Sequence, residues 1–317
     1  MKMKTMKTNK MMIALAVCLI LLAAGTVWLF GRSVGTAYAN AEMYTAGNTA
    51  ISSPVERLDV EWTAGKVRVV YGEGSGLLLE ETGNGAIPED RQMRWWLDGT
   101  TLRVRFEKPG LRLFNFNRGK TLTLTLPKGL ELASADIRTV SADMDLAGAD
   151  AGEMNLASVS GDIAGSVRCG KLNAATTSGD VRLEGENMAE CSASTTSGGI
   201  SLALRDGADK VTAASVSGKV TILAGDVKET KVSTTSGAVR LTVSGSFGDM
   251  AVSTVSGDVT AALGAATGFT LNFETTSGSL SSALPLTSEG RTRIYGDGSA
   301  RFGVRTVSGD VRLEEVE

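Results

Sequence analysis

The sequence predicts an all-β protein: a β-solenoid, similar to a single-stranded β-helix, with coils of about 19–20 residues, preceded by one N-terminal transmembrane helix. Three observations predict this class. A short stretch made of a β-branched residue, Ser-Gly and a further apolar residue recurs at spacings of 18 to 21 residues, with one last step of 31 that contains an insertion, as the repeats of a solenoid do. Apolar and polar residues alternate on both sides of each copy, as in strands with one buried face. A 20-residue run without a charge stands near the N-terminus.

The N-terminal region predicts a single-pass protein of the cell membrane. Residues 1–10 carry four lysines and form a basic cytoplasmic tail, and residues 11–30 contain no charge. At ~1.5 Å per residue this run can cross a hydrocarbon core of ~30 Å. Arg32 is the one basic residue close behind it, so the positive-inside rule places the N-terminus in the cytoplasm and the C-terminal domain outside.

The segment after this run leaves alternatives open. Ala37-Tyr38-Ala39 is a small-residue site after which a signal peptide could be cleaved, although the apolar run exceeds the usual h-region of about 7–15 residues. Residues 31–54 are rich in Ser, Ala, Thr, Gly and Asn and show no apolar period. This composition predicts a flexible tether, with an ordered arm as the alternative.

Composition excludes several classes of function. There is no His, which removes the commonest general base and every imidazole metal ligand. The net charge is −3, but the first 32 residues carry five basic groups and no acidic one, so the exported remainder is acidic and a poor partner for nucleic acid. Cys169 and Cys191 are offset by about three residues on neighbouring coils, which predicts two buried free thiols rather than a disulfide.

The repeat predicts how each coil is built. Relative to the central serine, positions −6, −4 and −2 share one face of a strand, and positions +3 and +5 share one face of a second strand. A Ser-Gly turn joins the strands, and its glycine serves either a positive φ or a close approach of stacked backbones. The predicted turn residues are Ser160, Gly161, Ser178, Gly179, Ser197, Gly198, Ser217, Gly218, Ser236, Gly237, Ser256, Gly257, Ser277, Gly278, Ser308 and Gly309. Position −2 is Ser or Thr in every copy, which predicts an inward ladder of hydroxyls, each donating to the next.

The regular repeats occupy residues 136–317, and residues 55–135 are predicted to form irregular coils of the same solenoid. In this earlier part, apolar residues at Leu58, Val60 and Trp62 precede Ala64-Gly65 with the parity of the repeat. A separate β-sandwich is the alternative. The acidic residues after Leu313 are expected to protect the far end of the stack from end-to-end pairing.

Candidate chemistry is sparse. Asp162 and Asp180 follow the turns of adjacent copies and could share a Ca²⁺ ion, the alternative being that Asp is a good turn residue. Glu184, Glu186 and Glu190 suggest a polysaccharide-cleaving site, but the aromatic residues on which sugars stack are scarce in the repeats. The sequence therefore predicts no catalytic residue, no metal site and no cofactor.

Aromatic and basic residues gather before the repeats. A possible binding surface consists of Arg94, Trp95, Trp96, Arg112, Phe114, Phe116 and Arg118. Neighbouring residues of a strand point to opposite faces, so one of the two tryptophans should lie outside the core. The alternative interpretation is a cap that packs onto the first coil, with the basic residues as its solvated rim.

Several stretches resemble a known family. The serial copies Thr-Thr-Ser-Gly-Asp-Val and Ser-Val-Ser-Gly-Asp-Ile, the strand Leu-Thr-Leu-Thr-Leu-Pro at 122–127 and the turn at 64–69 are similar to the bacterial putative-adhesin, β-strand-repeat family of unknown function. The resemblance covers about residues 55–317. Membrane-anchored members of this type, such as LiaG-like proteins, are associated with cell-envelope stress operons. The resemblance implies no catalytic residues and no cofactor.

We therefore expect a non-enzymatic extracytoplasmic β-solenoid, anchored to the cell membrane, with an adhesion, binding or scaffolding role at the cell envelope and a link to envelope stress. Its partner would be an envelope protein or a glycan, not nucleic acid. The alternatives are a surface polysaccharide-modifying enzyme of β-helix type and a self-assembling structural solenoid. Function is to be sought where the repeat breaks, at residues 85–120 and in the insertion between Ser277 and Ser308.

Overall fold

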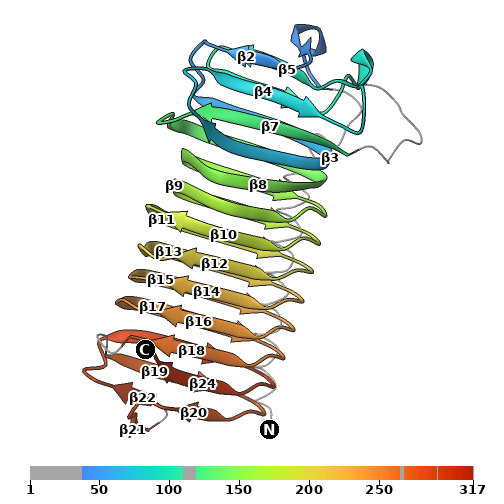
Figure 1. Ribbon diagram of the computed structural model, residues 1–317. Helices are drawn as coiled ribbons and strands as arrows, with labels where there is room; N and C mark the ends of the chain where they lie inside the picture. The colour runs from blue at the N-terminus through green and yellow to red at the C-terminus, as the bar shows by residue number, and fades with distance from the viewer. Residues whose placement is uncertain (1–37, 110–118, 265–267, 291, 317) are drawn as a thin grey trace.

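The computed structural model describes residues 38–109, 119–264, 268–290 and 292–316, which form an elongated rod (Figure 1). The predicted membrane span at residues 11–30 lies outside the described residues. Within the described ranges, no helix has the length and apolar character that crossing a membrane requires. The predicted all-β class is confirmed, because strands and two single-turn 3-10 helices are the regular elements of this part of the chain.

The N-terminal part contains η1 (Ala41–Met43), β1 (Thr45–Ala46), β2 (Thr49–Ile51), β3 (Arg57–Gly72), β4 (Leu77–Thr82), η2 (Glu89–Arg91), β5 (Arg94–Asp98), β6 (Thr101–Arg105) and β7 (Lys120–Pro127). The middle contains β8 (Leu132–Ser158), β9 (Ile163–Thr176), β10 (Val181–Glu186), β11 (Met188–Thr195), β12 (Ile200–Leu204), β13 (Ala208–Ser215), β14 (Val220–Ala224), β15 (Val227–Thr234) and β16 (Val239–Val243). The C-terminal part contains β17 (Phe247–Thr254), β18 (Val259–Leu263), β19 (Phe269–Glu274), β20 (Leu280–Ser282), β21 (Thr287–Glu289), β22 (Thr292–Tyr295), β23 (Ala300–Arg305) and β24 (Val311–Glu315).

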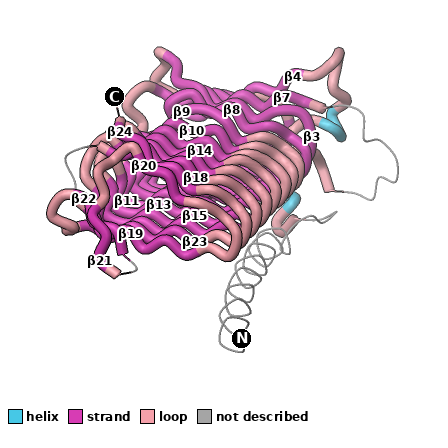
Figure 2. The backbone as a smooth tube through the Cα atoms, turned by 90° about the horizontal axis from the view of Figure 1, so that it is seen from below, coloured by secondary structure: helices cyan, strands magenta, loops and turns pink. Residues whose placement is uncertain are grey.

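Each coil of the middle part consists of two strands that pair in parallel with the same strands of the coils above and below. On one face, β11 lies between β9 and β13. On the other face, β10 lies between β9 and β12, so that Val181 stands opposite both Ile163 and Ile200. The long strands β3, β8 and β9 bend through the corners and take part in both faces. Figure 2 looks along the rod and shows the two faces, with the connecting loops stacked in a row at one corner.

The predicted alternation is confirmed. Cys191, Ala193 and Thr195 are buried on the first strand of one coil, and Ile200 and Leu202 are buried on its second strand. The residues between them on each strand are partly or fully exposed. The same parity in every coil places one continuous apolar core between the two faces.

The repeated glycines serve a close approach of backbones and not a positive φ. A Cβ atom added at Gly161, Gly198 or Gly218 would lie 1.9–2.1 Å from the carbonyl oxygen of the corresponding residue in the preceding coil. None of the repeated turn glycines is among the described residues with a positive φ. Any side chain at this corner would force the coils apart.

The predicted hydroxyl ladder is wrong in most of the stack. Within the described part of the chain, one direct contact of this kind occurs, from Thr139 Oγ1 to Ser158 Oγ at 2.9 Å. Thr195 Oγ1 instead donates to the carbonyl oxygen of Gly179 (3.0 Å), and Ser215 Oγ to that of Gly198 (3.1 Å). The close stacking of the glycines brings this carbonyl within reach, and a carbonyl needs a donor when it is buried.

Residues 55–135 continue the same stack, so the alternative of a separate β-sandwich is wrong. β3 pairs in parallel with β8, with Val60 opposite Ile137 and Trp62 opposite Thr139, in register with the repeat. β6 and β7 then pair with the other edge of β3. The antiparallel strands β5 and β4 follow them outward and close this end of the rod (Figure 1).

The predicted flexible tether at residues 31–54 is wrong for residues 38–54, which are its described part. β1 pairs antiparallel with β5, and β2 pairs antiparallel with β4. Tyr44 and Ile51 are buried there. This segment is ordered because it covers open strand edges and buries two large apolar side chains, and both effects offset the entropy of ordering a polar segment.

The last coil of the chain is not the last coil of the rod. β23 lies between β17 and β19, and β24 lies between β18 and β20. The coil that contains Ser308 is therefore inserted between the coils of Ser256 and Ser277. The expectation that the acidic C-terminus protects the far end is wrong, because the β21–β22 hairpin turns the chain back before β23 begins.

Candidate functional site

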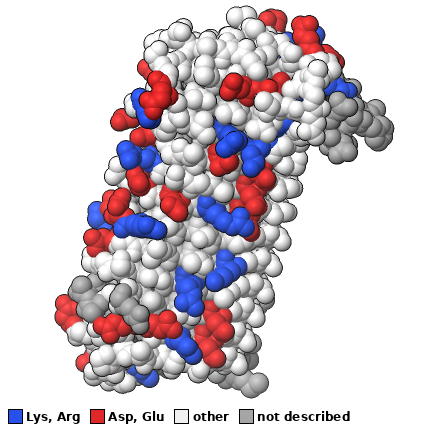
Figure 3. Space-filling view, in the orientation of Figure 1, with Lys and Arg blue, Asp and Glu red and all other residues white. Residues whose placement is uncertain are grey.

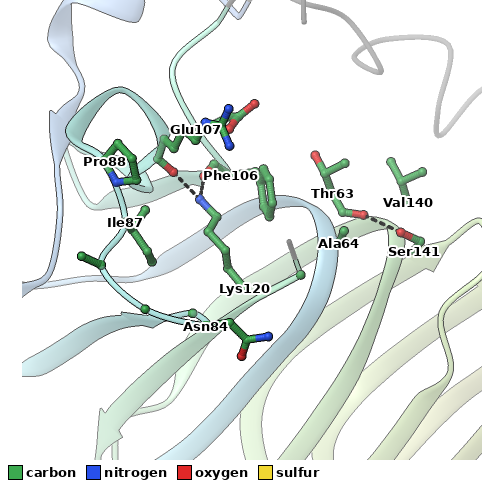
Figure 4. A pocket seen from close by; sticks show the side chains of 15 residues that line it. Thr63, Ala64, Asn84, Ile87, Pro88, Phe106, Glu107, Lys120, Val140 and Ser141 are labelled. Carbon is green, nitrogen blue, oxygen red and sulfur yellow. Dashed lines mark hydrogen bonds between the residues drawn. The ribbon is translucent and has the colours of Figure 1, made fainter. Parts of the chain in front are cut away.

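A pocket of about 260 Å³ lies where the repeat breaks, lined there by residues 83–88, 91, 106–107 and 119–120 (Figure 4). The loop from Gly83 to Pro88 forms one wall, and Phe106 and Glu107, at the end of β6, form another. The floor consists of two stacked corners of the rod, which contain Thr63-Ala64 and Val140-Ser141. The pocket thus lies where irregular coils meet the regular stack.

Local sequence explains the walls of this pocket. The loop contains Gly83, Gly85 and Pro88, residues that end a strand, and Gly85 has a φ of +102°. Ile87 is half-buried and lies inside the loop against the pocket. On the floor, Ser141 Oγ donates to the carbonyl oxygen of Thr63 at 3.2 Å, which ties the two corners together.

A buried ion pair supports the pocket from below. Lys120 Nζ lies 2.6 Å from Glu81 Oε1, and the two side chains are 6% and 2% exposed. Lys120 also donates to the carbonyl oxygens of Arg91 and Phe106, each at 2.5 Å, and lies 4.0 Å from the centre of the Phe106 ring. An ammonium group has three protons, so this one has no proton left for a ligand.

The charge of Glu81 is satisfied in the same way. Its carboxylate accepts the backbone N–H of Met93 at 3.0 and 3.1 Å in addition to Lys120. Burial lowers the pKa of Lys120 below its ordinary value, and the Glu81 carboxylate opposes this shift. The pair therefore fixes the start of β7 against β4 and the segment before β5.

An aromatic and arginine cluster covers the outer face of β5, β6 and β3. Asp59 is its centre: Arg103 Nη1 lies 2.8 Å and Arg105 Nη2 lies 2.9 Å from Asp59 Oδ2. The guanidinium groups of Arg103 and Arg105 lie 5.8 Å above Trp96 and 5.9 Å above Tyr44. Cation–π contacts of this kind favour well-ordered arginines.

Residues 55–314 match the sequence profile of one family, described as Toastrack DUF4097. The chain belongs to the Toastrack DUF4097 family. This confirms the predicted resemblance to a putative-adhesin β-repeat family of unknown function. No match is found among proteins with a curated description.

Three solved structures are similar to this Toastrack chain. A putative adhesin from Bacteroides fragilis NCTC 9343 has 14% identity and a TM-score of 0.46, with 89% of this chain and 100% of that chain covered. A putative adhesin from Parabacteroides merdae ATCC 43184 has 14% identity and a TM-score of 0.43, with 86% and 96% covered. A putative cell adhesion protein from Clostridium sporogenes ATCC 15579 has 12% identity and a TM-score of 0.26, with 86% and 100% covered.

The predicted binding surface is only partly within the described residues. Arg112, Phe114, Phe116 and Arg118 lie outside them. Trp95 packs against the core, while Trp96, on the opposite face of β5, contacts Tyr44 with ring centres 5.6 Å apart. As expected from the sequence, the two tryptophans of this chain lie on opposite faces of β5.

Arg94, the remaining residue of that surface, donates to the carbonyl oxygen of Glu89 at 2.9 Å. Sequence reasoning missed Tyr38 and Tyr44, which cover this face from the N-terminal side. Their ring centres lie 4.7 Å apart, and burial raises the pKa of Tyr38 to about 12. The misreading of residues 38–54 as a tether concealed both tyrosines.

The aspartates of the turns act as acceptors between coils. Asp162 Oδ1 accepts the backbone N–H of Asp180 at 2.8 Å, and Asp180 Oδ1 accepts that of Gly199 at 2.6 Å. The guanidinium group of Arg182 bridges the two carboxylates, so an arginine of the chain supplies the positive charge that a Ca²⁺ ion was expected to supply. Over the described ranges, no group of three or more acidic, Cys or His side chains is arranged to hold a metal ion.

The two described cysteines of this Toastrack chain are free and buried, as the sequence predicts. Cys191 stands opposite Leu172, three residues along β9 from Cys169. Burial raises the pKa of the Cys169 thiol to about 11 and that of Cys191 to about 12. Both thiols therefore act as small apolar groups of the core.

Proposed function

We propose that this protein is a non-enzymatic binding module of the cell envelope, whose ligand site is the pocket in Figure 4. The observation that carries the proposal is the position of this pocket, where the repeat breaks and a Gly-rich loop lies over two corners of the rod. Loops held by a rigid scaffold are frequent binding sites.

The lining of the pocket supports binding of a group with no net charge, because the charged residues Arg91 and Glu107 on its walls are opposite in sign. Ile87, Pro88, Phe106 and Val140 supply apolar surface, and Asn84 supplies both a donor and an acceptor. The volume lies near the lower limit of about 300 Å³ for ligand pockets, which suits one sugar ring or one side chain. Lys120 is fully engaged by Glu81 and two carbonyls, so the pocket's buried ammonium group serves structure.

The exterior of the rod supports the same class of partner. Figure 3 shows acidic and basic side chains interleaved on the face in view. Many charged side chains along the rod are paired between coils, for example Arg168 with Glu186 at 2.8 Å and Lys171 with Glu153 at 3.4 Å. A surface of mixed sign offers little to a polyanion such as nucleic acid and suits a neutral saccharide of the envelope.

The location that we propose follows from the charge-free run at residues 11–30 and the lysines before it. This segment would hold the rod on the outer side of the cell membrane, in an adhesion or envelope-stress role. The three similar structures are described as putative adhesins and a putative cell adhesion protein, in keeping with this role. Protease treatment of intact cells tests the location: the rod should be digested, and protection from the protease would contradict it.

A glycan array tests the ligand site with the full chain in detergent. Ala86 is exposed and lines the pocket, so Ala86→Trp should fill it and abolish binding of a saccharide that the unchanged protein retains. Ala189→Trp, at an exposed position of β11, is the matched control and should bind normally. Equal binding by both variants, or cleavage of the saccharide, would overturn the proposal.

A further inference from the structure

The end of the rod opposite the pocket has an open strand edge. β20 pairs with β24 on one side, and within the described residues no strand pairs with its other side. On the neighbouring face β22 covers the outer edge of β19, and β21 pairs with β22 in turn, so the outermost strand there is β21, which carries the charged Glu289. Figure 1 shows β20 and β21 at that end of the rod.

The hydrogen-bonding groups that this edge presents can be identified. Ser279 accepts from Val311 N–H through its carbonyl oxygen (2.8 Å), and Ala283 N–H donates to Leu313 (3.0 Å). The odd-numbered residues of β20 therefore bond to β24. In a parallel ladder the residues between them direct their N–H and C=O groups to the opposite side, so Leu280 and Ser282 present theirs outward.

The end surface around this edge is uncharged and partly apolar. From residue 275 to residue 288 the chain has no Asp, Glu, Lys or Arg. Phe273, Leu280 and Leu286 are only half-buried, as the last layer of a core with no further coil on it. Natural proteins usually protect open edges with charges or bulges, and β20 itself carries neither.

We propose that β20 pairs antiparallel with β20 of a second copy of this chain, about a two-fold axis through Ser281. Leu280 then stands opposite Ser282 of the other copy, and the outward N–H and C=O groups of these residues form four hydrogen bonds. Close to a two-fold axis, a side chain lies next to the same residue of the other chain, so a charge there would face a like charge. The neutral stretch at 275–288 satisfies this condition, which selects a second copy as the occupant.

Association through β20 stops at a dimer, because the opposite end of the rod cannot accept β20 in the same way. There the parallel coils end under the antiparallel strands β4 and β5, so it offers no coil onto which β20 could stack in the register of the repeat. The strands run perpendicular to the rod axis, so pairing through β20 joins two rods end to end. The ends that contain β4 and β5 then point away from each other. If the proposed N-terminal anchor holds, the pair would connect two facing membranes, which gives the proposed adhesion a partner.

Cysteine cross-linking of the full chain in detergent tests the pairing. In this register the two Ser281 residues stand opposite each other as a non-hydrogen-bonded pair, with Cα atoms about 4.5 Å apart. This distance lies within the ~4.4–6.8 Å range of a disulfide. Ser281→Cys should therefore give a reducible dimer under mild oxidation. The matched control is Ser201→Cys, an exposed position in the same column of side chains on β12, which has strands on both sides and should stay monomeric.

A charge exchange supplies the second measurement, by analytical ultracentrifugation at high protein concentration. The unchanged chain should show a monomer–dimer equilibrium, Ser281→Lys alone should be at least tenfold weaker in self-association, and a mixture of Ser281→Lys with Ser281→Glu should associate again. Equal cross-linking at Ser281 and Ser201, or association unaffected by Ser281→Lys, would overturn the proposal. The Ala86→Trp variant should still dimerise, so failure of the ligand site and failure of the pairing are distinguishable.

Discussion

Gly218 lies so close to Gly198 of the preceding coil that a Cβ atom on it would be 1.9 Å from the Gly198 carbonyl oxygen. The atom in the way belongs to a backbone, so it cannot move without displacing a whole coil. This relationship recurs at each Ser-Gly corner and explains why the glycine is retained while the residue after it varies between Asp, Lys, Ala, Gly and Ser.

The first prediction concerns this contact. Gly218→Ala should lower the free energy of unfolding by about 2 kcal/mol or more, because the methyl group must separate two stacked coils. Gly199→Ala, in the turn of the preceding coil, is the control, since a Cβ there would meet its nearest neighbour, the Lys219 carbonyl oxygen, at 3.5 Å, an ordinary contact. Urea unfolding followed by circular dichroism measures both, and equal stability of the two variants would show that the corner can relax.

The second prediction concerns the buried ion pair. Lys120→Met leaves the Glu81 carboxylate without its cation and should destabilise the protein by about 3–5 kcal/mol. The double variant Lys120→Met with Glu81→Gln should lose clearly less, because Gln is uncharged and still accepts the Met93 N–H. Chemical unfolding of the two variants gives the comparison. A double variant as unstable as Lys120→Met alone would mean that packing of the lysine, and not its charge, matters.

The third prediction follows from the inserted coil. Deletion of residues 300–317 removes β23 and β24 from between the coils of Ser256 and Ser277, so β19 and β20 lose their parallel partners. Hydrogen exchange at residues 268–290 and 292–299 should rise to the rate of an unfolded segment, while β12 and β13 stay protected. Retained protection in these residues would mean that they can pair directly with β17 and β18.

The fourth prediction concerns the two buried thiols in a Cys18→Ser background. Burial raises the pKa of Cys169 to about 11 and of Cys191 to about 12, so at pH 8 neither should react with a disulfide reagent until the protein unfolds. Raised thiol pKa values contribute stability that is complete below about pH 9 and is lost as the pH rises through 11 to 12. Rapid labelling of either thiol in the folded protein at pH 8 would contradict the burial on which both statements rest.

The structure of a single coil could be predicted from the local sequence pattern. The period-two alternation and the fixed spacing of Ser-Gly indicate which residues are buried, where corners occur and that the coils stack, because these depend on neighbours within one repeat. The same parity placed Trp95 and Trp96 on opposite faces of β5. The carbonyl acceptors of the Thr195 and Ser215 hydroxyls escaped this reasoning, since they depend on how closely successive corners approach.

The site and the ends of the rod were decided by tertiary structure. Glu81 and Lys120 share the parity of the buried Leu79 and Leu122, so alternation places both on the inward face but does not show what neutralises their charges. They pair because β4 and β7 are neighbours at a closed end. The pocket exists because β3 lies between β7 and β8, which brings the corners at Ala64 and Ser141 beneath one loop. Chain order suggests that the last repeat ends the stack. Instead the coil of Ser308 lies between the coils of Ser256 and Ser277, and β20 and the β21–β22 hairpin occupy the end of the rod, because hydrogen bonding between strand edges and not position in the chain sets the order of the coils.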